Sequence, residues 1–182
     1  MTPLTTALSA IRAHRPCESG WHKLLAHLGK TGADDEPIAF ETILDSNGLD
    51  DALWCCRAAR QYDREWRLFA VWCARQVQHL MADPRSLAAL DVAERFAWGE
   101  ASVEELASAE AAARTAARTA AWAAAGAAAG AAAGAAAWDA AWDAARAAAW
   151  DAARGAAWDA AWPAARDAQT AEFRRVVRGD AA

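Results

Sequence analysis

The stretch DREWRLFAVWCARQVQHLM, residues 63–81, carries the clearest structural signal in this chain. Its apolar residues recur at steps of three and four, the spacing that places side chains on one face of an α-helix. They are Trp66, Phe69, Cys73, Val77 and Leu80. A helix with such a stripe must bury it against other helices. We therefore expect residues 63–81 to form a central helix of a helical protein.

Helix-boundary signals predict further helices on the C-terminal side of this stretch. Asp83 and Pro84 supply an N-cap and a first-turn proline for the next helix, and Gly99 can close it. Ser102 and Glu105 have the spacing of a capping box, which opens the last and longest predicted helix. No segment shows the two-residue alternation of a strand. The sequence therefore predicts an all-α fold.

Shorter helices are predicted on the N-terminal side. Ser19 can cap a helix that Gly29 closes. Pro37 suits the first turn of a helix that stops before Gly48, and Asp50 can cap the helix after it. Together these signals predict a helical bundle of about six short helices over residues 1–100.

The repeat WDAAWDAARAAAWDAARGAAWDAAW, residues 138–162, belongs to the last predicted helix. Nearly all large side chains from Arg114 to Arg166 follow a step of four. Four residues overshoot a helical turn by about 40°, so the tryptophan stripe circles the helix instead of staying on one face. We predict one long helix over residues 101–175, continuous or bent near Gly126–Gly134, that packs on the bundle as one structural unit. Residues 176–182 are predicted to form a disordered tail.

Three interpretations of the tryptophan stripe stay open. The first is that the indole rings form core. The second is that part of the spiral is exposed and binds a partner, because tryptophan and arginine dominate interface hot spots. The third is a repeat that expanded by slippage and has little selected purpose. The second interpretation makes seven residues candidates for partner binding: Trp138, Trp142, Arg146, Trp150, Arg154, Trp158 and Trp162.

Composition excludes several classes of function. The net charge is −5 and no basic block is present, so direct binding of nucleic acid is not expected. The first sixteen residues lack the pattern of a secretory signal, so we expect no export and four reduced cysteines in the cytoplasm. Residues 120–138 carry no charge, but they lack Leu, Ile, Val and Phe. Alanine and glycine bury too little apolar area to drive insertion, so no membrane association is expected.

The candidates for catalysis are weak. Four residues of the stretch 63–81 form a polar cluster, and this cluster serves either to tie helices together or to hold a substrate. They are Asp63, Arg67, Arg75 and His79. No nucleophile is paired with a base, and the spacing of His14, Cys17, His22 and His27 matches no zinc signature. We expect no enzymatic activity, no cofactor and no metal.

Three segments carry a family resemblance: NGLDDALWC (47–55), DREWRLFAVWCARQVQHLM (63–81) and DPRSLAALDVAERFAWGEA (83–101). They resemble the immunity-protein family of bacterial polymorphic-toxin loci, whose members also occur in phage-related genomes. Members often carry an alanine-rich helical tail with recurring Trp and Asp, which matches residues 110–170. The resemblance implies a protein that occupies the active site or an allosteric surface of a toxin and needs no catalysis of its own.

Two functions follow as hypotheses. The first is a non-enzymatic inhibitor of a protein partner, which is a toxin or, in a phage setting, a component of a host defence complex. The second is a self-associating helical scaffold, in which exposed tryptophans pair in a symmetric homo-oligomer. Stoichiometry distinguishes them, because a binder keeps a free surface and an assembly element forms a defined higher oligomer.

Overall fold

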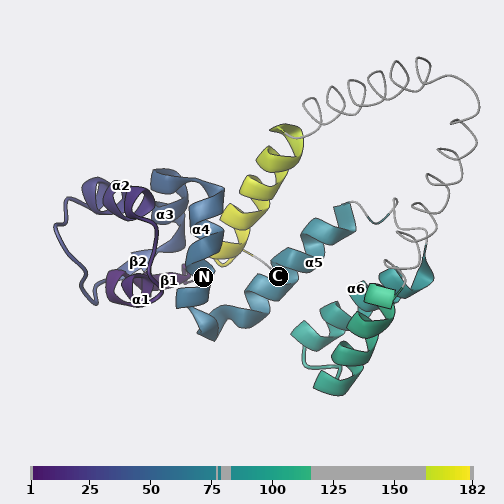
Figure 1. The fold of residues 1–182 in the computed structure, drawn as a ribbon. Helices are drawn as coiled ribbons and strands as arrows, with labels where there is room; N and C mark the ends of the chain where they lie inside the picture. Colours follow the sequence, from purple (N-terminus) through teal and green to yellow (C-terminus); the bar gives the residue numbers. More distant parts are fainter. Residues whose placement is uncertain (1, 77, 79–82, 116–162, 181–182) are drawn as a thin grey trace, which may run out of the picture. The chain divides into compact units, whose positions relative to one another are not determined.

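The computed structural model describes residues 2–76, 78, 83–115 and 163–180. These residues are mostly helical and include one small two-stranded sheet (Figure 1), so the all-α class is confirmed in outline. They divide into two compact units. The first consists of Met1–Cys73 with Ala168–Ala182, and the second of Ala74–Asp167.

The first unit contains most of the secondary structure. Its elements are β1 (Thr5–Ala7), α1 (Leu8–Ala13), α2 (Glu18–Leu28), β2 (Pro37–Ala39), α3 (Phe40–Asn47), α4 (Leu49–Cys55), two 3₁₀ turns (Cys56–Ala58 and Arg60–Tyr62) and most of α5 (Asp63–Gln76). A C-terminal helix over residues 163–177 completes it from residue 168 onward.

The two strands were not predicted. β1 pairs with β2 in antiparallel orientation, with Thr6 opposite Ile38 and Ala7 opposite Pro37. Pro37, predicted in a first helical turn, begins the strand instead, and the helix starts at Phe40. The prediction failed because three-residue strands are too short to show alternation. Their pairing also joins segments that are distant in sequence.

Aromatic rings from three helices form the centre of the first core. The Trp66 ring stacks on Phe173 with centroids 6.0 Å apart, and its centroid lies 4.9 Å from that of Phe40. Phe69 meets Phe173 edge-on at 5.4 Å. Trp66, Phe69 and Cys73 all belong to or pack against this core, as the predicted stripe requires. Val77 and Leu80 of that stripe lie outside the described residues.

The C-terminal helix extends into residues 176–182, the segment that was predicted to be a disordered tail. Phe173, Val176 and Val177 are buried, and the Leu4 N–H donates to the Val177 carbonyl at 2.8 Å. Gly179 closes the helix at a φ of +79°, where its N–H donates to the Val176 carbonyl. Residues 176–180 are therefore ordered, because an apolar triad at helical spacing fills the core of the first unit.

The second unit confirms the predicted helix boundaries. The Asp83 carboxylate accepts the Arg85 N–H at 2.9 Å, and α6 (Pro84–Ala97) follows it. Ser102 and Glu105 make both bonds of a capping box, at 2.8 and 3.1 Å. The helix that they open is described over residues 103–115.

The domain boundaries differ from the prediction of one bundle over residues 1–100. Among the described residues, the core of the first unit receives no side chain from residues 74–167. The division therefore falls within α5, between Cys73 and Ala74. The predicted long helix over 101–175 is described only at its two ends, and its central part lies outside the described residues.

Candidate functional site

The predicted partner-binding residues are not part of the described structure. Trp138, Trp142, Arg146, Trp150, Arg154, Trp158 and Trp162 all fall within residues 116–162. The structure does describe the two segments that flank residues 116–162. One is the helix that begins at Val103, and the other is the C-terminal helix.

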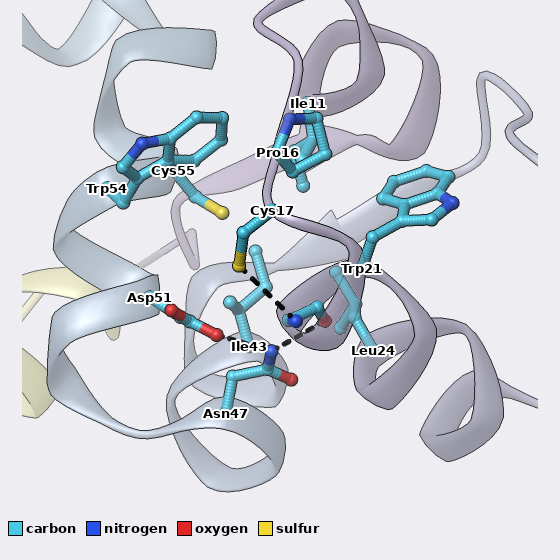
Figure 2. A pocket seen from close by; sticks show the side chains of 11 residues that line it. Ile11, Pro16, Cys17, Trp21, Leu24, Ile43, Asn47, Asp51, Trp54 and Cys55 are labelled. Carbon is cyan, nitrogen blue, oxygen red and sulfur yellow. Dashed lines mark hydrogen bonds between the residues drawn. The ribbon is translucent and has the colours of Figure 1, made fainter.

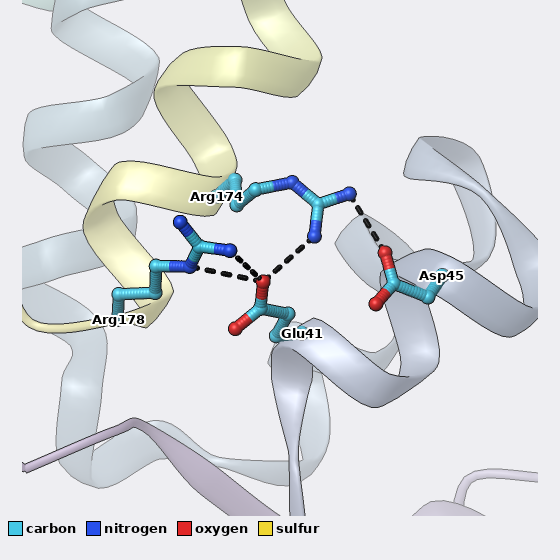
Figure 3. A network of polar contacts seen from close by, with 4 residues as sticks. All are labelled: Glu41, Asp45, Arg174 and Arg178. Carbon is cyan, nitrogen blue, oxygen red and sulfur yellow. Dashed lines mark hydrogen bonds and ion pairs between the residues drawn. The ribbon is translucent and has the colours of Figure 1, made fainter.

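Ion pairs fix the C-terminal helix to α3 (Figure 3). Arg174 Nη1 donates to Glu41 Oε1 at 2.7 Å, and its Nη2 donates to Asp45 Oδ1 at 2.7 Å. Arg178 Nε donates to the same Glu41 oxygen at 2.9 Å. The guanidinium groups of Arg178 and Arg174 lower the pKa of Glu41 to about 2. The helix that follows the repeat is thus held both by apolar packing and by a charged contact.

The described members of the predicted polar cluster make separate contacts. Asp63 Oδ2 lies 3.8 Å from Arg67 Nη2, whereas Arg75 Nη2 contacts Asp91 at 2.6 Å and Glu94 at 2.9 Å on α6. The fourth member, His79, lies outside the described residues. Arg75 therefore ties α5 to α6.

The buried cysteines are poor nucleophiles, because burial raises the pKa of their thiols. All four cysteines are free. Burial raises the pKa of both Cys55 and Cys56 to about 12, with the Asp51 charge contributing at Cys55. These two thiols stay protonated at neutral pH, and the thiolate is the reactive form.

The described residues contain neither a metal-binding cluster nor a membrane-spanning helix. No group of three or more His, Cys, Asp or Glu side chains in that part of the chain is placed to hold a metal ion. None of the helices described there is both long and apolar enough to cross a bilayer. The uncharged stretch 120–138 lies outside those residues.

The first unit contains a cavity of about 140 Å³ that the sequence analysis missed. Figure 2 shows side chains from α1, the α1–α2 loop, α2, α3 and α4 converging on it. Its walls are mainly apolar. The lining residues are Ile11, Pro16, Cys17, Gly20, Trp21, Leu24, Ile43, Asn47, Asp51, Trp54 and Cys55.

A hydrogen-bond network holds one carboxylate at this cavity. Asn47 Nδ2 donates to the Gly20 carbonyl at 2.8 Å and to Asp51 Oδ2 at 2.7 Å. Ser46 Oγ donates to Asn47 Oδ1, which fixes the orientation of the amide. Gly20 allows the close approach, since a Cβ there would lie 2.7 Å from Asp51 Oδ2.

No local pattern in the sequence could have predicted this cavity. Cys17, Asn47 and Asp51 come from three different segments, and only the tertiary packing of α2 on α3 and α4 brings them together. The sequence analysis identified Asn47 and Gly48 only as a helix stop. That interpretation explains the backbone but not the amide side chain.

Comparisons of this chain with protein-family models, with curated proteins and with solved structures give no match. The resemblance to immunity proteins therefore stays a prediction from the quoted segments.

Proposed function

We propose that this protein is a non-enzymatic, cytoplasmic inhibitor that binds a protein partner through the Trp/Arg repeat of residues 138–162. The partner is a bacterial toxin or, in a phage setting, a component of a host defence complex. Five of the eleven tryptophans of the chain fall within this repeat, and three arginines lie in it or close to its ends. The resemblance of residues 47–101 to immunity proteins supports the same role.

The anchored C-terminal helix is the observation that carries this proposal. Phe173 and Val177 are buried in the first unit, and Arg174 is paired with Glu41. The repeat is thus an internal segment that leads into a folded anchor, and not a free chain end. Fixing one end of a binding segment reduces the conformational entropy that it loses on association.

Several charged side chains of the described residues form contacts between helices. Arg75 bridges α5 and α6, and Glu41 bridges α3 and the C-terminal helix. Cys55 and Cys56 are held as thiols by burial. These contacts favour a scaffold that presents a binding segment over a reaction centre.

Affinity capture from the native host tests the proposal. The tagged protein is expected to retain one stoichiometric partner, and Trp142→Arg is expected to lose it. Trp98→Arg is the matched control, because Trp98 is 47% exposed and lies outside the repeat. Co-expression of the partner with the wild-type protein should then restore growth that the partner alone inhibits. Equal capture by Trp142→Arg and the wild type contradicts the proposed role of the repeat.

A self-associating scaffold is the second candidate. The observation that favours it is the exposure of apolar side chains in the second unit, where Trp98 is 47% and Val103 is 64% exposed. Contacts between copies of the chain would bury such groups. Light scattering of the purified protein separates the two candidates, since a defined higher oligomer that survives dilution supports the scaffold and a monomer or dimer supports the inhibitor.

A further inference from the structure

We propose that the cavity of the first unit binds a primary ammonium group on a short apolar stem, with the Asp51 carboxylate as its counter-ion. This site lies between α2, α3 and α4, and the proposal does not depend on the Trp/Arg repeat.

The first argument is the charge of the cavity. Asp51 is the one carboxylic acid among the lining side chains, and no Lys, Arg or His lines the cavity. Its Oδ2 accepts from Asn47, and it forms no ion pair with any cation in the part of the chain that the structure describes. A carboxylate accepts hydrogen bonds at both oxygens, so Oδ1 keeps acceptor capacity. An ammonium group adds a direct attraction between opposite charges to this hydrogen bond, which an alcohol cannot provide.

The second argument is the shape and polarity of the walls. Trp21, Leu24, Ile43 and Trp54 line the same cavity as the Asp51 carboxylate (Figure 2). An apolar cavity of about 150 Å³ accommodates benzene, which has six carbon atoms. A four-carbon stem with a terminal nitrogen has five heavy atoms and therefore suits the 140 Å³ available here.

The third argument is the two indole rings. Trp21 and Trp54 both line the cavity. The arginines that stack on them do not line it, and they lie 5.3 Å (Arg12) and 4.4 Å (Arg57) from the ring centroids. The apolar surface of an indole ring packs well against the methylene groups of an alkylammonium ligand.

The fourth argument is the fixed position of the carboxylate. Asn47 holds Asp51 while also bonding to the Gly20 carbonyl of α2, so the counter-ion is oriented before a ligand arrives. Gly20 keeps the space in front of the carboxylate open, because a Cβ would contact Asp51 Oδ2 and the Cys17 sulfur. Preorganisation of this kind lowers the cost of binding.

Alkylammonium groups have two sources in a cell, and the site chemistry is the same for both. One is the lysine side chain of another protein, and the other is a free small amine. The lysine stem has four carbons, which matches the size of the cavity. The test below separates the two sources.

The first experiment is an NMR titration of the full chain with n-butylammonium chloride, with sodium chloride at equal ionic strength as the reference. The readout is the indole N–H resonances of Trp21 and Trp54, assigned through Trp21→Phe and Trp54→Phe. We expect saturable shifts of these resonances with a Kd on the order of 1 mM, as suits a ligand of five heavy atoms. n-Butanol, which has the same stem without charge, should bind at least tenfold more weakly.

Two adjacent aspartates provide the decisive variant and its control. Asp51→Asn keeps an acceptor for Asn47 but removes the charge, and it should weaken butylammonium binding at least tenfold. Asp50→Asn changes an exposed carboxylate in the same helical turn, outside the cavity lining, and should bind like the wild type. Gly20→Ala should also weaken binding, because its methyl group displaces the Asp51 carboxylate.

A second readout uses the exposed Cys17 thiol at the cavity. Saturating butylammonium should slow its alkylation by iodoacetamide in the wild type and leave the rate unchanged in Asp51→Asn. Equal affinity of Asp51→Asn and the wild type, equal affinity for n-butanol, or no shift at either indole overturns the proposal.

N-acetyl-lysine N-methylamide then identifies the source. Binding as tight as that of butylammonium indicates that the site takes a lysine side chain from a protein. Binding of butylammonium but not of the lysine derivative indicates a free small amine. Both outcomes support an ammonium site.

Discussion

Arg174 Nη1 donates a hydrogen bond to Glu41 Oε1 over 2.7 Å, although the two residues are 133 positions apart. Beside this pair, Val177 accepts the backbone N–H of Leu4. The last helix of the chain is therefore part of the same core as its first strand and helices. Residues 168–182 thus belong to the same compact unit as residues 1–73, although the repeat lies between them in the sequence. This connectivity explains how a long alanine-rich repeat can coexist with a conventional small core.

Glu41→Gln is predicted to remove a pH-dependent part of the stability. The pKa of Glu41 falls from an ordinary 4.5 to about 2 in the folded protein, through Arg178 and Arg174. The carboxylate thus stabilises the fold fully above about pH 4.5, and this contribution disappears as the pH falls towards 2. The Glu41 side chain is 29% exposed, so screening by solvent reduces its contribution to the free energy of unfolding to about 1–2 kcal/mol.

Urea unfolding followed by circular dichroism at about pH 7 and pH 2.5 measures this contribution. The wild type should lose more stability between the two values than Glu41→Gln. Asp45→Asn, which removes one contact of Arg174 at a more exposed carboxylate, is the control and should lie close to the wild type. An identical pH dependence of the wild type and Glu41→Gln would show that the ion pairs are not formed in solution.

Phe173→Ala is predicted to destabilise the first unit by about 3–5 kcal/mol, because it leaves a cavity among packed rings. Phe173 is fully buried and contacts the rings of Trp66 and Phe69. Hydrogen exchange at the amides of α3 reports the change. Val103→Ala, at a position that is 64% exposed in the second unit, should alter this exchange by less than about 0.5 kcal/mol. Unchanged protection in Phe173→Ala would place the C-terminal helix outside the core.

Several helix ends and core positions of this fold could be predicted from local sequence patterns. The caps at Asp83 and Ser102, the left-handed Gly29 at φ +64° and the apolar positions Trp66 and Phe69 were all found from spacing alone. These signals act within one turn of a helix, so they can be recognised without tertiary information.

The starts of two other helices were predicted wrongly, because they depend on contacts that residue spacing does not reveal. The cap of α2 is Cys17, whose sulfur accepts the Gly20 N–H at 3.4 Å, and not the predicted Ser19. Gly48, and not Asp50, precedes α4. Phe173 and Val177 form an apolar pair at a step of four. This signal was present, but Phe173 was assigned to the long repeat helix and Val177 to the disordered tail. The cavity required side chains from separate elements and was not predictable at all.

Thiol labelling is predicted to distinguish the cysteines. At about pH 8, iodoacetamide should modify the exposed Cys17 first. Cys55 and Cys56 should react slowly, because burial raises the pKa of both thiols to about 12 and the thiolate is the nucleophile. Peptide mass spectrometry after timed quenching measures each rate. Addition of urea should make the rates converge, and fast labelling of Cys55 in the native protein would contradict its buried position.

Arg75→Ala is predicted to loosen α6 without removing an activity. Arg75 Nη2 contacts Asp91 at 2.6 Å and Glu94 at 2.9 Å, and both carboxylates are largely exposed. Such pairs contribute at most about 1 kcal/mol, so we expect a modest rise in hydrogen exchange along α6. Arg67→Ala is the matched control on the same helix, since its contact with Asp63 is longer at 3.8 Å. A substrate-binding role for Arg75 would instead show as lost function with unchanged exchange.

Trp142→Ala and Trp150→Ala test the proposed role of the repeat most directly. If these indoles contact the partner, each variant should weaken binding by about 2 kcal/mol or more, because truncation of a hot-spot tryptophan costs that much. Titration calorimetry with the captured partner measures the loss, and circular dichroism should show little change in helicity. Trp98→Ala, which alters an exposed tryptophan outside the repeat, should retain the affinity. Insoluble or unfolded Trp142→Ala and Trp150→Ala proteins would instead assign both rings to a core, and a protein that binds normally without them would leave the scaffold as the better function.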